Sequence, residues 1–444
     1  MIRATTGGVL KSYRRNLMNS FIARNKAQDT VLTQRNFNSY AEDPAAAARA
    51  FKLRKARMTV ESQYSVCTDT HKKFQTGWTS LEGISKLIDT ENAEPMKTLA
   101  GTSLTMLNDP TADAREQLTK ALDQISQTII QNLNQKYGEN FIFSGADGHN
   151  VPFEIKDDKL YYRGVSVDAA VPKIFADGNG ASVKLNANGQ VDPAGDHFLL
   201  STGLKTISES AYEQAVKNYQ NDPTGNPPPD LLKNTAGDNA LFVDKDGNKY
   251  YIEKSGAQSM TQAEIDATTK DAEKLKYLMN EKQFVDIGLG FQENENGQLI
   301  ESSAYNAALN GLTFIGYGLD ADGDPKNIYS LVQKMKEIGA RVKDGENWTK
   351  ADYDEFDGLV KKLEKASSEF KTEFTNMGAG TQKLENNVEL LEDNFYNLQE
   401  QYSDIEDVDM ADAITSFVWA QYCYNAALKV GNSVLSESLM DYLK

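Results

Sequence analysis

Three aspartates in the segment DADGDP, Asp320, Asp322 and Asp324, follow one another at the alternate spacing of calcium ligands. A complete EF-hand loop also needs glycine at its sixth position and glutamate at its twelfth, where this chain has Pro325 and Leu331. We therefore interpret the segment as a tight polar turn, keep a bound cation as the alternative, and predict no metal site.

The histidines and the glycine-rich segments match no common catalytic or phosphate-binding motif. His71, His149 and His197 are the only histidines, none belongs to an H-E-x-x-H pair, and no G-x-S-x-G elbow occurs. The segments G-N-G at 178–180 and G-L-G at 288–290 lack the remaining glycine of G-x-G-x-x-G, and no glycine-rich loop is followed by a Walker A lysine. We predict no catalytic residues, no cofactor-binding residues, no cofactor and no enzymatic activity.

Cys67 and Cys423 are the only cysteines, which excludes a disulfide scaffold and a thiolate metal cluster within the chain. We interpret both as small apolar residues in a core. A bridge between them would require their α-carbons to come within about 7 Å.

Length and composition describe a folded protein of two to four domains, because 444 residues with 40% hydrophobic content can fill cores. We predict no membrane span, since no run of about 18 apolar residues occurs, and no cleaved signal peptide. The net charge of -17 argues against a nucleic-acid partner, which would require surplus lysine and arginine.

The charges are distributed unevenly. Residues 1–60 contain twelve basic and three acidic residues, a net +9, whereas residues 385–444 contain two basic and twelve acidic residues, a net -10. The ends could be independent solvated faces, or residues 1–28 could be an arginine-rich transit peptide. We favour paired helices, because both ends also carry apolar stripes.

Apolar residues at both ends recur at three- and four-residue steps, which predicts amphipathic helices. An apolar chain end that would otherwise fray needs a partner. We therefore predict helical assembly arms over residues 1–42 and 406–444. Their packing residues are Leu10, Tyr13, Leu17, Phe21, Met410, Ile414, Phe417, Tyr424, Leu428, Leu435, Leu439, Tyr442 and Leu443.

Residues 43–140 and 326–405 are predicted to form a helical rod domain. Asp43 before Pro44 is a helix-start signal, Gly138 suits a helix C-cap, and Gly378 with Gly380 predicts a kink. Near residue 90 and before residue 112 we expect helix breaks. A heptad seam about 75 Å long is formed by Phe356, Val360, Leu363, Phe370, Phe374, Leu384, Val388, Leu391, Phe395, Leu398, Tyr402 and Ile405, with Ser367 and Thr381 interrupting it.

Residues 141–325 read as an inserted β-rich, mixed outer domain, because Gly, Asn, Asp and Pro separate short β-type runs. Asp246-Gly247 predicts a hairpin turn, and helical pieces are expected near 209–219 and 263–279. The predicted fold class is mainly α with an α+β insert, in which long N- and C-terminal helices pair as a coiled-coil rod.

Several segments together resemble the flagellin superfamily, specifically the hook–filament junction proteins called type 3 hook-associated proteins. These segments are "TQRNFNSYAEDPAAAARAFKLR", "NFIFSG" followed by Pro152-Phe153, "VDIGLGFQENENGQLIESSAYNAALNGLTFIGYG" and "VDMADAITSFVWAQYCYNAALKVGNSVLSESLMDYLK". The resemblance covers residues 1–150 and 280–444. It departs at Gln34, where the family usually has glycine, at Asn36, where it has a basic residue, and at Glu42, where it has aspartate.

The resemblance implies a structural subunit of the bacterial flagellum, located outside the cell after type III export without a cleaved signal peptide. Its implied partners are copies of itself in a ring, the hook-proximal junction protein on one side, flagellin on the other, and an export chaperone on the C-terminal helix. Two alternatives remain: a flagellin-type filament subunit, and a secreted module that binds glycan or host protein on a helical stalk.

Overall fold

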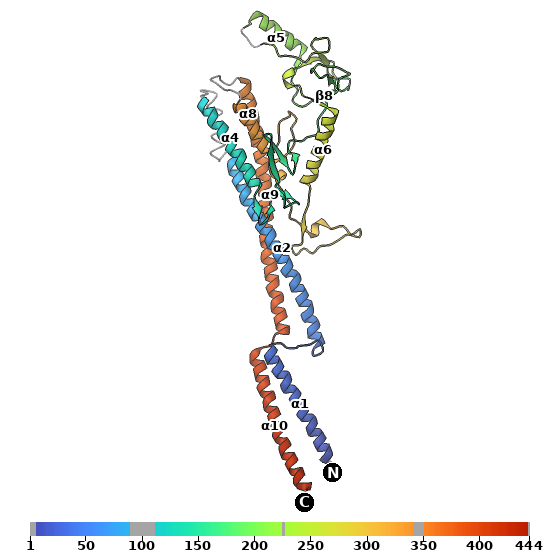
Figure 1. Cartoon of the computed structure of the whole chain (residues 1–444), viewed down its shortest axis with the longest axis vertical. Coiled ribbons are helices and arrows are strands. Elements are labelled where there is room, and N and C mark those ends of the chain that lie inside the picture. The colour runs from blue at the N-terminus through green and yellow to red at the C-terminus, as the bar shows by residue number, and fades with distance from the viewer. Residues whose placement is uncertain (1–5, 89–111, 224–226, 341–349, 443–444) are drawn as a thin grey trace. The chain divides into compact units, whose positions relative to one another are not determined.

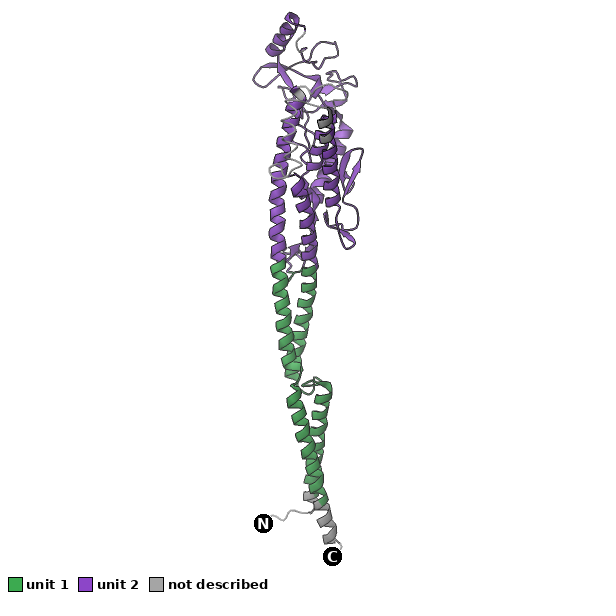
Figure 2. Cartoon of the chain, turned by 90° about the vertical axis from the view of Figure 1, so that its left-hand side faces the viewer, with its two compact units in different colours: residues 1–68, 286–291, 385–444 green, residues 69–285, 292–384 purple. Residues whose placement is uncertain are grey.

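The computed structural model describes residues 6–88, 112–223, 227–340 and 350–442. It divides into two compact units, drawn in different colours in Figure 2. Unit 1 contains residues 1–68, 286–291 and 385–444, and unit 2 contains residues 69–285 and 292–384. Both ends of the chain therefore belong to one unit, together with the parts of the predicted rod that adjoin them.

Helices account for most of the described residues (Figure 1). The predicted fold class, long terminal helices with an α+β insert, is confirmed. The α-helices are α1 (Thr6–Thr33), α2 (Pro44–Ile88), α4 (Ala112–Leu133), α5 (Glu209–Asn221), α6 (Gln262–Met279), α7 (Gly311–Ile315), α8 (Ile328–Ala340), α9 (Lys350–Glu406) and α10 (Met410–Tyr442), and the 3-10 helices are η1 (Lys254–Gly256) and η2 (Glu301–Ser303).

The strands are short and pair antiparallel. Three-stranded sheets have the orders β4-β5-β6, β12-β8-β7 and β10-β11-β9, and the pairs are β1-β2, β15-β3 and β13-β14. Their bounds are β1 (Lys136–Tyr137), β2 (Asn140–Phe141), β3 (Ser144–Gly145), β4 (Phe153–Lys156), β5 (Lys159–Tyr162), β6 (Val165–Ser166), β7 (Lys184–Leu185), β8 (His197–Leu199), β9 (Thr206–Ser208), β10 (Leu241–Val243), β11 (Lys249–Ile252), β12 (Ser259–Thr261), β13 (Phe284–Val285), β14 (Tyr305–Asn306) and β15 (Leu309–Asn310).

The start of α2 follows its capping signal. The Asp43 carboxylate accepts hydrogen bonds from the amides of Ala45 and Ala46 at 3.1 and 2.9 Å, which satisfies two N–H groups that a helix start leaves free. The predicted N-cap is therefore confirmed. The breaks expected near residue 90 and before residue 112 lie at 89–111, outside the described residues.

Within unit 2, helices α2, α4, α8 and α9 enclose an apolar core. α4 lies alongside α8, where Gln333 donates to the Ser126 hydroxyl at 3.0 Å and Lys336 pairs with Asp123. The buried Ser367 hydroxyl donates to the Ile88 carbonyl at 3.1 Å, so this interruption of the apolar seam satisfies the last turn of α2. The buried side chains include Leu81, Ile84, Ile88, Leu122, Ile129, Met335, Ile338, Phe356, Leu363 and Phe370.

Of the glycine predictions, the kink at Gly378 and Gly380 stays a prediction, and the helix cap at Gly138 needs correction. Helix α9 continues through Gly378 and Gly380 without interruption. A Cβ at these positions would lie 3.4 Å from the Trp78 indole nitrogen and 3.2 Å from the Tyr305 hydroxyl, so the glycines admit neighbouring rings. Gly138 is not a helix cap: α4 ends at Leu133, and Gly138, with φ of 60°, turns the β1-β2 hairpin.

The insert has a core of its own, formed by Val183, Leu185, Leu199, Leu232, Ala240, Phe242 and Ile252. Several of its turns are of one kind, in which an Asp or Asn oxygen accepts backbone amides and a glycine three residues later has positive φ. The turn at Asp246-Gly247 joins β10 to β11 and confirms the predicted hairpin. Helices α5 and α6 confirm the two expected helical pieces.

Candidate assembly interface

Helices α1 and α10 lie side by side in unit 1 (Figure 1). The rings of Phe21 and Tyr424 are 5.9 Å apart, and the Arg24 guanidinium lies over both, 5.1 Å from the first centroid and 4.9 Å from the second. Gly431 is buried against Tyr13, because a Cβ there would lie 1.9 Å from the phenol oxygen. These contacts join the N-terminal helix to the C-terminal helix through an aromatic and cation–π seam.

The predicted arm residues fall into three groups. Tyr13, Leu17, Met410, Phe417 and Tyr424 are half-buried, whereas Leu10, Phe21, Ile414 and Leu428 are exposed. The side chains of Leu435, Leu439 and Tyr442, and the whole of Leu443, lie outside the described residues. The α1-α10 contact therefore uses only part of the apolar surface that its sequence supplies.

A further set of apolar residues on the two helices is exposed, and the three- and four-residue pattern missed it. We call it the outer apolar surface; Trp419 and Tyr422 on α10 are 62% and 67% exposed. A helix that is apolar on every side is normally buried, and the run FVWAQYCY could have indicated this. The outer apolar surface consists of Met18, Ile22, Val418, Trp419, Tyr422 and Val430.

The expected charge pairing is concentrated at one residue. Glu406, the last residue of α9, is 3% exposed and pairs with Arg35 and Arg54, each at 3.0 Å. Arg54 also donates to the Tyr402 hydroxyl at 2.7 Å. Lys11, Arg14, Arg15 and Lys26 on α1 are exposed and form no ion pair within the described residues, so part of the +9 charge is available to other molecules.

The segments that connect α1 to α2 and α9 to α10 are held together by backbone and side-chain hydrogen bonds. Gln34 has φ of 57°, a conformation that favours glycine, and its carbonyl accepts the Val408 amide at 3.1 Å. The side-chain amide of Asn36 donates to the backbone carbonyls of Ile405 and Asp407 at 3.1 and 2.8 Å. Gln34 and Asn36 thus hold the two connecting segments together.

The predicted heptad seam runs along α9. Phe356, Leu363, Phe370, Leu384 and Leu391 are buried, and Val360, Phe374, Val388, Phe395, Leu398, Tyr402 and Ile405 are half-buried. In unit 2, Phe374 stacks on Trp78 of α2 at 5.3 Å between centroids. In unit 1, Asn387 of α9 donates hydrogen bonds to the Ile287 carbonyl and the Cys67 sulfur.

The two cysteines are free and differ in exposure. Cys67 is buried, and this burial raises the pKa of its thiol despite the opposing hydrogen bond from Asn387. Cys423 is exposed on α10, so the expectation that both are buried is wrong for this residue. Its helix presents apolar and polar side chains alike to the surface, and heptad position alone does not distinguish them.

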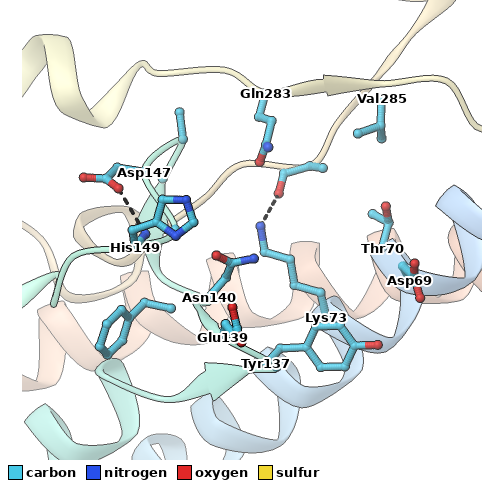
Figure 3. Close-up of a pocket in the computed structure, with 16 residues that line it drawn as sticks. Asp69, Thr70, Lys73, Tyr137, Glu139, Asn140, Asp147, His149, Gln283 and Val285 are labelled. Carbon is cyan, nitrogen blue, oxygen red and sulfur yellow. Dashed lines mark hydrogen bonds between the residues drawn. The ribbon is translucent and has the colours of Figure 1, made fainter.

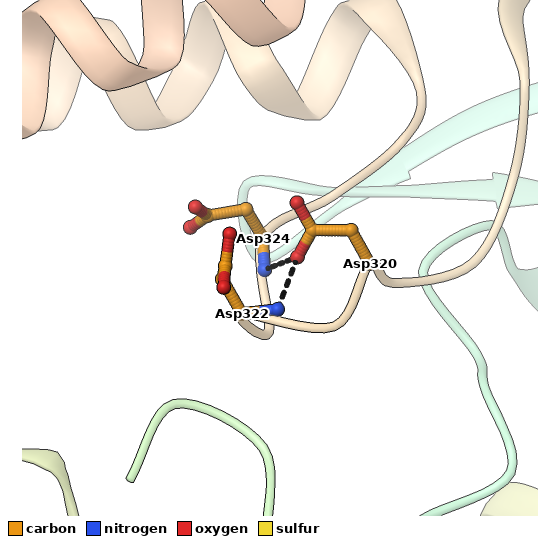
Figure 4. Close-up of side chains that lie close together, drawn as sticks. All are labelled: Asp320, Asp322 and Asp324. Carbon is orange, nitrogen blue, oxygen red and sulfur yellow. Dashed lines mark hydrogen bonds between the residues drawn. The ribbon is translucent and has the colours of Figure 1, made fainter. Parts of the chain in front are cut away.

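The aspartates of DADGDP surround a lysine in unit 2. Lys362 of α9 lies 2.7 Å from Asp320 and 2.8 Å from Asp322 and also pairs with Asp324, which in turn pairs with Lys334 of α8. Figure 4 shows Asp320 accepting the backbone amides of the other two aspartates, which fixes the turn. The ammonium of Lys362 thus lies where a bound cation would contact the three aspartates. Through Lys362 and Lys334 the cluster connects the turn to α9 and α8.

The pKa values follow from these contacts. Burial tends to raise the pKa of Asp324, but hydrogen bonds from Lys334 and Lys362 outweigh it and hold that pKa below its usual value. Burial tends to lower the pKa of Lys362, and the hydrogen bonds to the three aspartates raise it above the ordinary lysine value. Each partner therefore stabilises the charged form of the other.

No helix among the described residues combines the length and the apolar composition that crossing a membrane requires.

The comparisons with known proteins give one match at the C-terminal end of the chain and several similarities to solved structures. Residues 360–443, which span most of α9 and α10, match the family model of the bacterial flagellin C-terminal helical region. The comparison with curated proteins finds no match.

Among solved structures, similarity is found to a Vibrio parahaemolyticus protein described as a flagellar hook-associated protein, with 10% identity and a TM-score of 0.42, covering 82% of this chain and 100% of that one. Hook-associated protein 3 of Legionella pneumophila has 11% identity and a TM-score of 0.38, with 80% and 98% covered. The Legionella pneumophila flagellar junction protein FlgL has 13% identity and a TM-score of 0.35, and the match covers 76% of this chain and 99% of that one. Residues 360–443 are thus similar to the C-terminal helical region of bacterial flagellins, in agreement with the resemblance noted at the C-terminus.

Proposed function

We propose that the chain is a structural, non-enzymatic subunit of the bacterial flagellum that forms the junction between hook and filament. The observation that carries this proposal is the outer apolar surface of the α1-α10 pair, which lies within the region matched to flagellins on its α10 side. Exposed apolar surface of this kind marks a protein interaction site. The segments NFIFSG and SLMDYLK favour a junction protein over a filament flagellin.

Self-association is proposed to occur through the paired terminal helices, with neighbouring copies covering the outer apolar surface. The proposed contact residues are the predicted arm residues, from Leu10 to Leu443, together with Trp419 and Tyr422. The heptad seam of α9 acts within each copy, holding the α2 and α9 helices together. The exposed lysines and arginines of α1 then select register and partner more than they add stability.

The partners we propose are copies of the same chain in a ring, the hook-proximal junction protein, flagellin, and an export chaperone that covers the C-terminal helix before assembly. The location is extracellular, on the flagellum. An apolar surface such as that around Trp419 would promote aggregation before export, which gives a chaperone a physical role.

The test introduces a charge into the outer apolar surface by the substitution Trp419→Asp. The variant is produced in a flagellated bacterium as the only copy of this chain. We expect hooks without attached filaments in electron micrographs and flagellin released into the medium, because a buried unpaired charge is costly in an interface. The control is Tyr277→Asp on α6, an equally exposed aromatic residue in unit 2. Normal filaments with the Trp419 variant would contradict the proposal.

A second assay separates the junction role from that of a flagellin-type filament subunit. Purified chain is concentrated and seeded, and its polymers are imaged. A junction subunit needs its neighbours and forms no long filament alone. Long filaments made from the chain by itself would favour the filament subunit.

A further inference from the structure

A cavity in unit 2, lined by several polar side chains, plays no part in the proposed assembly. Its volume is about 690 Å³, within the range of small-molecule sites. It is bounded by α2, the β1-β2 hairpin, the loop after β3, and β13. Figure 3 shows side chains from these elements converging on one space.

Several of these polar side chains have no protein partner. Within the described part of the chain, the side chains of Asp69, Tyr137, Asn140 and Gln283 make no hydrogen bond or ion pair. Asp69, Asn140 and Gln283 are exposed and Tyr137 is half-buried, so water can satisfy these groups until a ligand replaces it. Four such groups around one cavity therefore offer donors and acceptors to a ligand.

Lys73 projects from α2 into the middle of this space (Figure 3). Its ammonium donates to the Ala307 carbonyl at 3.0 Å and forms no ion pair within the described residues. Burial lowers the pKa of the Lys73 ammonium. With one of its three protons engaged, the group retains two donors for a ligand hydroxyl or carbonyl.

The charges decide which ligands fit. Three carboxylates, Asp69, Glu139 and Asp147, line the cavity together with Lys73 and His149, and Asp147 is paired with Arg163 at 3.8 Å. Phosphate, sulfate or a carboxylic acid would meet net repulsion there. Neutral hydroxyl groups can instead accept from the lysine and the two amides and donate to the carboxylates, while the half-buried ring of Tyr137 offers an apolar face.

We propose that this cavity binds a small neutral saccharide of one or two rings. Asn140 and Gln283 are the orienting residues, because each amide presents a donor and an acceptor in one plane. Lys73 supplies a further donor at the centre, and Asp69 accepts from a hydroxyl. The proposal is independent of the junction role, because none of these residues belongs to the helix arms.

The test measures binding to the full-length purified chain by saturation-transfer NMR and isothermal titration. The neutral probes are methyl glucoside, maltose, lactose and diacetylchitobiose, with glucosamine and galacturonic acid as charged relatives. We expect a neutral probe to bind with a dissociation constant on the order of millimolar, as a ligand of this size allows. Galacturonic acid should bind more weakly, because of the three carboxylates.

Asn140→Ala and Gln283→Ala should each weaken binding about tenfold, the loss of one or two hydrogen bonds. Asn397→Ala and Gln401→Ala, exposed positions on α9, are the matched controls and should leave binding unchanged. All four positions are exposed, so melting curves should match the parent chain and exclude misfolding as a cause.

Three results would overturn the proposal. The first is no binding of any neutral probe at a concentration about ten times the expected dissociation constant. The others are tighter binding of galacturonic acid than of the neutral probes, and equal probe affinity in the Asn140→Ala variant and the control variants. Because hooks and filaments play no part in these measurements, their failure would leave the junction role untouched.

Discussion

The α1-α10 pair and the insert treat apolar side chains in opposite ways. In the insert, Phe242 and its neighbours are buried in a small core, and tight Asx-Gly turns close the strands around it. In the helix pair, Trp419 and Tyr422 remain exposed although the helices are in contact. The insert has a closed apolar core within one chain, although side chains such as Tyr277 and Phe291 stay exposed, whereas the helix pair leaves large apolar side chains exposed beside its own contact.

Hydrogen exchange gives the largest contrast between the two regions. We expect the amides of α1 and α10 to exchange rapidly in the monomer and to be protected about a hundredfold more after assembly, because isolated helix pairs are marginal in water. The insert strands should change little. The measurement is exchange mass spectrometry on monomer and assembled flagella. Equal protection of α10 in both states would show that the helix pair is complete by itself.

Shortening a core side chain of the insert should strongly destabilise the insert and leave the helix pair unaffected. Phe242→Ala removes a buried ring whose centroid lies 5.9 Å from that of Phe175 and 6.0 Å from that of Tyr250. We expect a loss of about 3–5 kcal/mol in the free energy of unfolding. Leu241→Ala, exposed on the same strand, is the control and should cost under about 0.5 kcal/mol. Urea denaturation of both variants measures the difference. Similar losses would contradict a closed insert core.

The aspartate–lysine cluster gives unit 2 a pH dependence. The pKa of Asp324 is lower in the folded chain, so its contribution is full above the unfolded value near pH 4 and is lost as the pH falls through the folded pKa. Asp324→Asn should cost about 1.5–3 kcal/mol at neutral pH and flatten the acid limb of the stability curve. Urea midpoints between pH 2 and 7 test this. An acid limb that is the same in the variant and the parent chain would show that the cluster does not cause the pH dependence of stability.

The smallest effect concerns the close contact of the helix pair. Gly431→Ala places a Cβ against the Tyr13 phenol, which must move, and should destabilise the α1-α10 contact by about 1–2 kcal/mol. Gly358→Ala on α9 has open space and should instead stabilise its helix by about 0.5–1 kcal/mol. Exchange rates of α1 amides report the first change, and exchange rates of α9 amides near residue 358 report the second. The same sign for both variants would show that Gly431 is not in close contact.

Sequence reasoning could predict the helices because their signals are local. The Asp43-Pro44 start of α2 and the Asp246-Gly247 turn depend on residues within one turn of each other, and both are confirmed. Gly138 was misread, because a glycine can end a helix, turn a hairpin or admit a neighbouring ring. Only the neighbours, such as Trp78 beside Gly378, decide between these uses.

The sequence by itself determined the long helices, the heptad seam of α9 and the apolar character of both ends, because periodicity and composition are properties of the chain alone. Only the tertiary structure decided which apolar residues stay exposed, that Lys362 fills the aspartate cluster, and that Lys73, Asn140 and Gln283 meet around a cavity. These outcomes depend on contacts between residues far apart in sequence, and their spacing along the chain carries no record of those distances.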